Sequence, residues 1–145
     1  MIQFIQGDCL AQNTDIIVNT VNCVGVMGKG LALSVKQNHE WAYNHYRKVC
    51  DAKKLRPGMI LVSRLESKPT IFHCAVKDDW RNDSNFEWVA SCLFKLRVYL
   101  EAHPDVSVSM PVMGSGNGKL PYDDCVMLIT SALSELPNHI VVCTL

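Results

Sequence analysis

The chain has 145 residues, 48% of them hydrophobic, and its 14 basic and 14 acidic side chains cancel to a formal charge of zero. This length is typical of one domain with a full hydrophobic core, so we expect a single domain over residues 1–145. The zero net charge argues against a protein that binds nucleic acid non-specifically over much of its surface, because such binding depends on clustered cations. The local basic cluster within residues 47–56 is typical of a solvated helix end and turn.

Seven cysteines are scattered along the chain. There is no C-x-x-C motif and no Cys/His spacing that fits zinc, so we expect neither a disulfide framework nor a metal site. Several cysteines lie in apolar runs, such as Cys74 in IFHCAV, which indicates buried reduced thiols and a cytoplasmic location. The first ten residues lack the features of a signal peptide, and no apolar stretch is long enough to cross a membrane, so no membrane partner is expected.

The predicted elements alternate between strands and helices. Apolar runs predict strands at residues 2–7, 15–21, 59–65, 70–76, 106–113 and 139–145. One helix is predicted from Gly30 to about Ala52, and a second begins at a capping box formed by Ser84 and Glu87. A third follows the glycine-rich loop near residue 118. The residues expected to face the core are Leu31, Val35 and Tyr46 in the first helix, Phe86, Val89, Ala90, Leu93 and Leu100 in the second, and Val126, Ile129, Leu133 and Leu136 in the third.

This alternation implies parallel strand pairs joined by right-handed crossovers, and hence an α/β fold with helices on both faces of the sheet. In such sheets ligands bind beyond the carboxyl ends of the strands. We therefore expect the polar segments that follow successive strands to converge on one rim. These segments are residues 7–10, 19–30, 77–83 and 114–119.

Two of these segments are rich in glycine and run into helices. Glycine allows backbone N–H groups to approach a phosphate closely, and a helix N-terminus attracts anions. The P-loop pattern fails, because Cys23 stands where it needs glycine and Gly30 where it needs Ser or Thr. The dinucleotide fingerprint also fails, because the third glycine of 114–118 comes one residue early. Ordinary turns would explain each loop alone, but two on one rim favour a diphosphate clamp.

Polar side chains on the predicted rim have two interpretations each. Asp8 could accept hydrogen bonds from an adenine amino group, or it could cap a turn or helix. Asn19 and Asn22 lie at and just after a buried strand, so they either tie the loop down or meet ligand hydroxyls. Trp80 could stack on a base, although half-buried structural tryptophans are commoner.

Lys77 ends an apolar strand and is the candidate for catalysis. A partly desolvated lysine loses its proton more readily than a free one, and the neutral amine is a nucleophile towards a ribose anomeric carbon. The alternative is a surface lysine paired with Asp78 or Asp79.

Taken together, these segments resemble a macrodomain, the ADP-ribose-binding fold. The resemblance covers essentially the whole chain and rests on GD at 7–8, VNTVNCVGVMGKGLAL at 18–33, AVKDDWR at 75–81 and MGSGNGKL at 113–120. It implies a three-layer α/β/α domain with a mixed, mostly parallel six-stranded sheet. Within the family the chain is similar to the branch of the terminal ADP-ribose protein glycohydrolase. It is closer still to the antitoxin macrodomains that remove ADP-ribose from thymidine in DNA.

The resemblance implies a role for each matched position. Asp8 would hold adenine, Asn22 the distal ribose, and Lys77 would attack or polarise the anomeric carbon. No metal or cofactor is implied, since ADP-ribose is itself the ligand or product. The implied binding residues are Gly7, Asp8, Asn19, Thr20, Asn22, Val26, Met27, Gly28, Lys29, Gly30, Trp80, Met113, Gly114, Ser115, Gly116, Asn117 and Gly118.

The implied function is an ADP-ribosyl hydrolase acting on ADP-ribosylated DNA or protein, with a cognate ADP-ribosyltransferase as a further partner. The protein-directed relative carries an aspartate in the loop after the fifth strand, whereas this loop has no acid before Asp123. This departure favours a nucleobase in single-stranded DNA over ADP-ribosyl-glutamate, and leaves Asp78 or Asp79 as carboxylate candidates. The alternatives are a non-catalytic ADP-ribose reader, an ADP-ribose-1″-phosphate phosphatase, a hydrolase of ADP-ribosylated acidic residues, and a structural domain whose glycine loops are turns.

Overall fold

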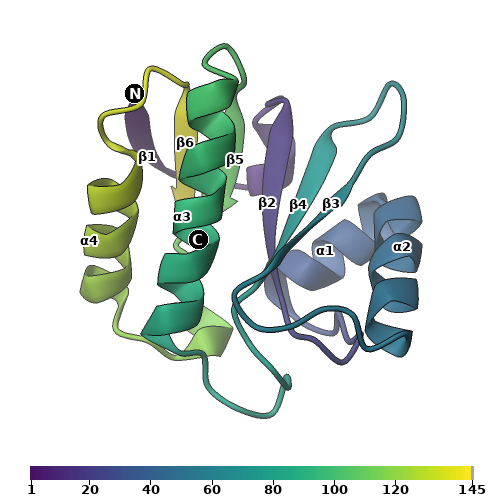
Figure 1. Cartoon of the computed structure of the whole chain (residues 1–145). Coiled ribbons are helices and arrows are strands. Elements are labelled where there is room, and N and C mark those ends of the chain that lie inside the picture. Colours follow the sequence, from purple (N-terminus) through teal and green to yellow (C-terminus); the bar gives the residue numbers. More distant parts are fainter. Residues whose placement is uncertain (145) are drawn as a thin grey trace.

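The computed structural model describes residues 1–144, which form one sheet with helices on both faces (Figure 1). The predicted end of the last strand at Leu145 lies outside the described residues. The strands are β1 Ile2–Gln6, β2 Ile16–Val21, β3 Ile60–Ser63, β4 Thr70–Ala75, β5 Val108–Pro111 and β6 Ile140–Thr144. The α-helices are α1 Gly30–Asn38, α2 Glu40–Asp51, α3 Phe86–Ala102 and α4 Tyr122–Leu133, with short 3-10 turns η1 Cys9–Ala11 and η2 Gly116–Gly118.

The six strands are arranged in the order β1-β6-β5-β2-β4-β3. Every neighbouring pair is parallel except β3 with β4, which is antiparallel. The central strand β2 pairs with β4 on one side and β5 on the other. The predicted mixed, mostly parallel six-stranded sheet between two helical layers is confirmed.

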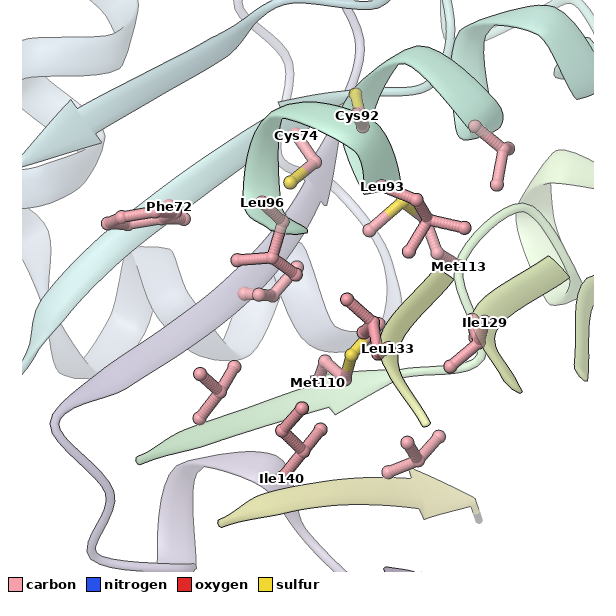
Figure 2. Packing of buried hydrophobic residues seen from close by; sticks show 14 of the residues in the cluster. Phe72, Cys74, Cys92, Leu93, Leu96, Met110, Met113, Ile129, Leu133 and Ile140 are labelled. Carbon is pink, nitrogen blue, oxygen red and sulfur yellow. The ribbon is translucent and has the colours of Figure 1, made fainter. Parts of the chain in front are cut away.

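The larger part of the core lies between the sheet and helices α3 and α4 (Figure 2). Every member of this cluster is at most 7% exposed, and burial of each large aliphatic chain contributes roughly 1.5–3 kcal/mol relative to exposure. Helices α1 and α2 cover the opposite face, where Val35, Ala42 and Tyr46 are fully buried. Residues of the larger cluster labelled in Figure 2 include Phe72 and Cys74 of β4, Leu93 and Leu96 of α3, Met110 of β5, and Ile129 and Leu133 of α4.

The prediction of one helix from Gly30 to Ala52 is wrong, because the chain breaks at His39 into α1 and α2. His39 has φ −135° and ψ 61°, so it is not helical, although its N–H still donates to the Val35 carbonyl. A continuous helix of that length would be about 34 Å long, whereas a strand of the sheet spans roughly 20 Å. The break keeps both halves packed on the sheet, and Val35 and Tyr46 are buried as predicted.

The predicted capping box at the start of α3 is also wrong. The N-cap is Asn85, whose side chain accepts a hydrogen bond of 2.8 Å from the Glu87 N–H. Ser84 instead donates its hydroxyl to the Val76 carbonyl, so it anchors the loop to the end of β4. As a result the helix presents Phe86 to solvent, together with Ala90. The other predicted inward residues of this helix, Val89, Leu93 and Leu100, are buried.

Two further sequence expectations concern the third helix and the cysteines. Ile129, Leu133 and Leu136 are buried as predicted, although Leu136 lies beyond the end of α4, and Val126 is half-buried. All seven cysteines are free thiols, and all except Cys23 are buried. Across residues 1–144, no helix has both the length and the apolar character that a membrane span requires.

Candidate functional site at the carboxyl rim of the sheet

The segments predicted to converge lie together at the carboxyl ends of the parallel strands, which we call the rim. The connections after β4 and β5 both lie at the lower end of the molecule in Figure 1. Two backbone hydrogen bonds of 2.9 Å join segments of the rim, one from Cys23 N–H to the Asp78 carbonyl and one from Ser84 N–H to the Gly118 carbonyl. A Cβ placed on Gly30 would lie 3.5 Å from the Asn117 side-chain nitrogen, so the two glycine loops also meet.

Asn22 organises the first glycine loop. Its Oδ1 accepts hydrogen bonds from the N–H groups of Val24 and Val26, at 3.1 and 3.3 Å, and its Nδ2 donates to the Val26 carbonyl at 2.8 Å. The side chain therefore ties the loop down, which is one of its two predicted roles. Contact with a ribose stays a prediction.

Asn19 lies beneath this loop and is fully buried. Its Nδ2 is 3.3 Å from Nδ1 of His73 and 4.0 Å from the sulfur of Met27, which is buried as well. Thr20 is half-buried near the end of β2. These side chains lie on the buried side of the loop, whereas the exposed residues of the loop are Val24, Val26, Gly28, Lys29 and Gly30.

The second glycine loop is tightly packed at its base and open at its tip. Gly114 has φ +93°, and a Cβ there would come within 2.8 Å of the Val89 side chain, so only glycine fits. Gly116 also has positive φ, but a Cβ there would meet nothing within 4 Å. Met113 and Gly118 are buried, Ser115 is half-buried and bonds to the Val112 carbonyl, and Asn117 is exposed beside Gly116.

The adenine end of the predicted site is the turn after β1. The N–H of Gly7 donates to the Thr144 carbonyl at 2.8 Å, which fixes the turn to the end of β6. Asp8 is the N-cap of η1, and its Oδ1 accepts from the Leu10 N–H at 2.9 Å. The carboxylate is exposed. The capping role proposed for Asp8 is therefore present, and its contact with adenine stays a prediction.

Lys77 is half-buried at the end of β4, and its Nζ donates to the Trp80 carbonyl at 3.2 Å. Burial lowers its pKa below the ordinary value by disfavouring the charged form, and the charges of Lys119 and Lys29 lower it further. The carboxylates of Asp83 and Asp79 act in the opposite direction. Burial and the two lysine charges outweigh the two carboxylates, so the neutral amine of Lys77 is favoured relative to that of a free lysine.

The expected alternative, an ion pair of Lys77 with Asp78 or Asp79, is not formed within residues 1–144. Asp79 instead holds Arg81, with oxygen to nitrogen distances of 2.7 and 2.9 Å, and this bidentate pair lowers the pKa of the Asp79 carboxyl to about 2. The carboxylate with the strongest influence on Lys77 is Asp83. Asp83 was not among the carboxylates predicted from the sequence, since its position depends on Ser84, which is bonded to the Val76 and Gly118 carbonyls in the folded chain.

Trp80 is 49% exposed, and the Arg81 guanidinium lies 5.5 Å from its ring centroid. An exposed indole next to a cation is the kind of surface on which a nucleobase stacks. Trp88 is half-buried on α3.

Two surface hollows lie outside the rim. One of about 520 Å³ is lined by Trp41, His45, Val62, Ser63, Arg64 and Leu65. The other, of about 430 Å³, is lined by Leu33, Lys36, Gln37, Glu40 and Tyr43. Neither is lined by residues of the glycine loops or by Lys77, so these hollows lack the features that mark the rim.

Comparison with known proteins identifies the family. The Macro domain family model matches residues 18–129, and the chain belongs to this family. A protein of Mycobacterium tuberculosis named DNA ADP-ribosyl glycohydrolase is 34% identical over 141 residues, which are 95% of this chain and 40% of that protein. A protein of the same name from Thermus aquaticus is 35% identical over 139 residues, or 94% of this chain and 39% of that protein.

Solved structures agree. The macrodomain of Mycobacterium tuberculosis DarG superposes with a TM-score of 0.92 at 33% identity, covering 100% of this chain and 98% of that one. The chain spans only about two fifths of the length of the curated relatives that it matches. The macrodomain resemblance inferred from the sequence is confirmed.

Proposed function

We propose that this chain is an ADP-ribosyl hydrolase that releases ADP-ribose from a nucleobase in single-stranded DNA, with Lys77 as its catalytic residue. The observation that carries the proposal is the environment of Lys77, which is half-buried at the rim and has a pKa lowered by burial and by the charges of Lys119 and Lys29 from the two glycine loops. A perturbed lysine without an ion-pair partner, next to loops that can bind phosphates, is typical of a functional site. The names of the relatives from Mycobacterium and Thermus support the same reaction.

In this proposal the rim orients ADP-ribose along its length. Asp8 and Gly7 hold the adenine, and backbone groups of residues 26–30 and 114–118 bind the diphosphate and distal ribose. Asn22 supports this arrangement from within the loop. The anomeric carbon of the distal ribose then lies next to Nζ of Lys77, and the acceptor base leaves in the direction of Trp80.

The proposed reaction is attack of the neutral Lys77 amine on the electron-poor anomeric carbon of the distal ribose. The Nζ lone pair forms a bond to the anomeric carbon while the bond to the base breaks, and the base departs with that electron pair and takes up a proton. Water then attacks the same carbon, the C–N bond to Lys77 breaks, and ADP-ribose leaves with the lysine restored. Asp83, whose charge acts on Lys77, exchanges the protons that these two steps require in this proposal.

The sequence favours DNA over an acidic protein residue as the acceptor. Residues 114–119 contain no carboxylate, whereas the protein-directed relative carries an aspartate in the corresponding loop. A hydrolase of this kind also presupposes a transferase that places ADP-ribose on the acceptor.

The test measures release of ADP-ribose from three substrates: an oligonucleotide with ADP-ribosylated thymidine, an ADP-ribosyl-glutamate protein, and ADP-ribose-1″-phosphate. The wild type is compared with Lys77→Ala and with Lys77→Arg, which keeps the charge but lacks a neutral amine. We expect release from the oligonucleotide by the wild type, reduced at least about 100-fold in both variants. Preference for either other substrate would replace the DNA assignment, and binding of ADP-ribose without any release would identify a reader.

A further inference from the structure

The basic cluster found in the sequence lies next to the rim in the folded protein. Residues 47–56, here called the basic segment, carry five of the fourteen cations of a chain whose formal charge is zero. Asp51 is the one acid among them, and it is paired with Arg47 at 3.1 Å. All five cations are exposed, namely Arg47, Lys48, Lys53, Lys54 and Arg56.

One end of the basic segment contacts the first glycine loop. The Arg47 guanidinium donates to the Gly25 carbonyl at 3.3 Å. A Cβ placed on Gly25 would lie 2.9 Å from Cδ of Arg47, so the arginine stem packs directly on the loop. Gly25 has φ +90°, which brings its backbone close to the helix without a side chain between them.

The other end of the basic segment reaches the strand that carries Lys77. The turn that begins at Arg56 is closed by a bond from Met59 N–H to the Arg56 carbonyl at 3.1 Å. Within this turn the Gly58 N–H donates to the Ala75 carbonyl at 2.7 Å, two residues before Lys77. In Figure 1 the connection from α2 to β3 runs along the same lower end as the β4–α3 connection.

We propose that the basic segment binds the sugar-phosphate backbone of the single-stranded DNA that flanks the modified base. This inference rests on the proposed function and adds the surface that distinguishes a DNA strand from a lone ADP-ribosylated nucleoside. Exposed lysines and an exposed tryptophan lie on connections that run along the same end of the molecule. This combination matches the usual chemistry of single-strand binding, in which cations track phosphates and aromatic rings stack on bases. Trp80 follows Lys77 by three residues, and the turn at the end of the basic segment is bonded to the end of β4 through Gly58 and Ala75.

Three lysines of the basic segment are available to contact phosphates. They make no side-chain hydrogen bond or ion pair with the described residues, and they are Lys48, Lys53 and Lys54. Three such lysines within residues 47–56 fit a contact with few nucleotides. A phosphorylated or acidic protein would also meet these charges, but it would not supply bases for Trp80. Nucleic acid is therefore the partner that uses both features.

The experiment compares two substrates and two charge-matched variants. The substrates are ADP-ribosylated thymidine as a nucleoside and the same modification within an oligonucleotide. The test variant combines Lys48→Gln, Lys53→Asn and Lys54→Gln, with asparagine at residue 53 because its φ of +57° suits asparagine. The control variant removes the same charge elsewhere, by Lys36→Gln, Arg64→Gln and Lys68→Gln. The readout is the ratio of kcat/KM for the oligonucleotide to kcat/KM for the nucleoside.

We expect the test variant to lower this ratio about tenfold at low salt, as the sum of three exposed charge contacts, and the control variant to leave it unchanged. The dependence of log(kcat/KM) on log salt for the oligonucleotide should become shallower by roughly 2 in the test variant, because each lost phosphate contact on a single strand removes about 0.7. Thermal unfolding of both variants verifies that they fold.

An unchanged ratio and salt slope in the test variant would overturn this inference while leaving the hydrolase intact, as would an equal loss in the control variant. If the wild type releases nothing from either substrate, the proposed function fails. In that case the ratio of equilibrium affinities for the oligonucleotide and the nucleoside replaces the ratio of kcat/KM. A decrease of this ratio in the test variant alone would still support the inference, and an unchanged ratio would overturn it. Weaker binding of an ADP-ribosylated acidic peptide, with oligonucleotide binding unchanged, would assign the segment to protein partners and overturn the DNA assignment.

Discussion

The hydroxyl of Tyr46 on α2 donates to both the backbone carbonyl and the Oδ1 of Asn22, at 2.8 and 2.9 Å, from a fully buried position. One side chain of the helical layer thereby holds the residue that shapes the first glycine loop. Burial raises the pKa of this phenol well above its ordinary value, so it remains a donor at any pH at which the protein is folded.

Removal of this hydroxyl should loosen the loop more than it destabilises the fold. Tyr46→Phe keeps the ring and its packing, so we expect the free energy of unfolding to fall by only about 1 kcal/mol. Affinity for ADP-ribose should fall as well, because Asn22 loses a donor that fixes its side chain. Denaturant unfolding and calorimetric titration measure the two effects, with Tyr122→Phe on the exposed start of α4 as the control. Unchanged affinity for ADP-ribose would show that the Tyr46 hydroxyl does not contribute to ligand binding.

The buried imidazole of His73 should make the fold sensitive to acid. Burial, aided by the charge of His45, lowers the pKa of His73 to about 3. The unfolded chain binds a proton on this residue below about 6.5, whereas the folded protein does so only near 3. The free energy of unfolding therefore decreases as the pH falls through this window, by up to about 1.4 kcal/mol per pH unit for this group.

Denaturant midpoints between about pH 7 and pH 4 measure this dependence. A variant His73→Gln keeps hydrogen-bonding groups between Ser63 and Asn19, and it should flatten the curve relative to the wild type. The matched control is His139→Gln, an exposed residue, whose curve should follow the wild type. Parallel curves for the wild type and His73→Gln would show that His73 is not the source of the pH dependence.

The lowered pKa of Lys77 should be visible in the pH dependence of turnover. In the proposed mechanism the neutral amine is the reactive form, so kcat/KM should rise with pH and level off at an apparent pKa below the ordinary lysine value of 10.5. Lys119→Gln removes one of the charges that lower this pKa, so the profile should move to higher pH. Asp83→Asn removes an opposing charge, and its profile should move to lower pH. Shifts of both variants in one direction would contradict the charge arrangement around Lys77.

The two ends of the second glycine loop should respond differently to the same substitution. Gly114→Ala places a methyl group 2.8 Å from the Val89 side chain at positive φ, so we expect a loss of roughly 2–3 kcal/mol from overpacking and strain together. Gly116→Ala meets open space and should lose only about 1 kcal/mol for its positive φ. Denaturant unfolding of both variants tests this difference, and equal losses would show that packing at Gly114 is not decisive.

Much of the fold was predictable because its signals are local. Apolar runs such as the one that ends at Val21 marked the buried strands, and the carboxyl-end rule for parallel strands placed Lys77 beside the two glycine loops. Each of these inferences needs only neighbouring residues and one general property of α/β sheets.

The remainder depends on contacts between distant residues. Ser84 has the spacing of a capping box with Glu87, but its bonds to Val76 and Gly118 leave capping to Asn85. The tie between Tyr46 and Asn22 joins a helix to a loop, and no periodicity in the sequence marks it. The basic segment likewise has the composition of an ordinary helix end, and only its position in the fold links it to the rim.

The antiparallel direction of β3 brings a further connection to the rim. The parallel strands send their chains outward there, whereas β3, at the edge of the sheet, receives its chain at that end through residues 52–59. Of that connection, Gly58 and Met59 are bonded to Ala75 of β4, whereas the exposed residues 52–54 precede these bonds. Under the proposed function, changes at residues 52–54 would alter contacts with the acceptor strand and leave the strands beneath the glycine loops in place.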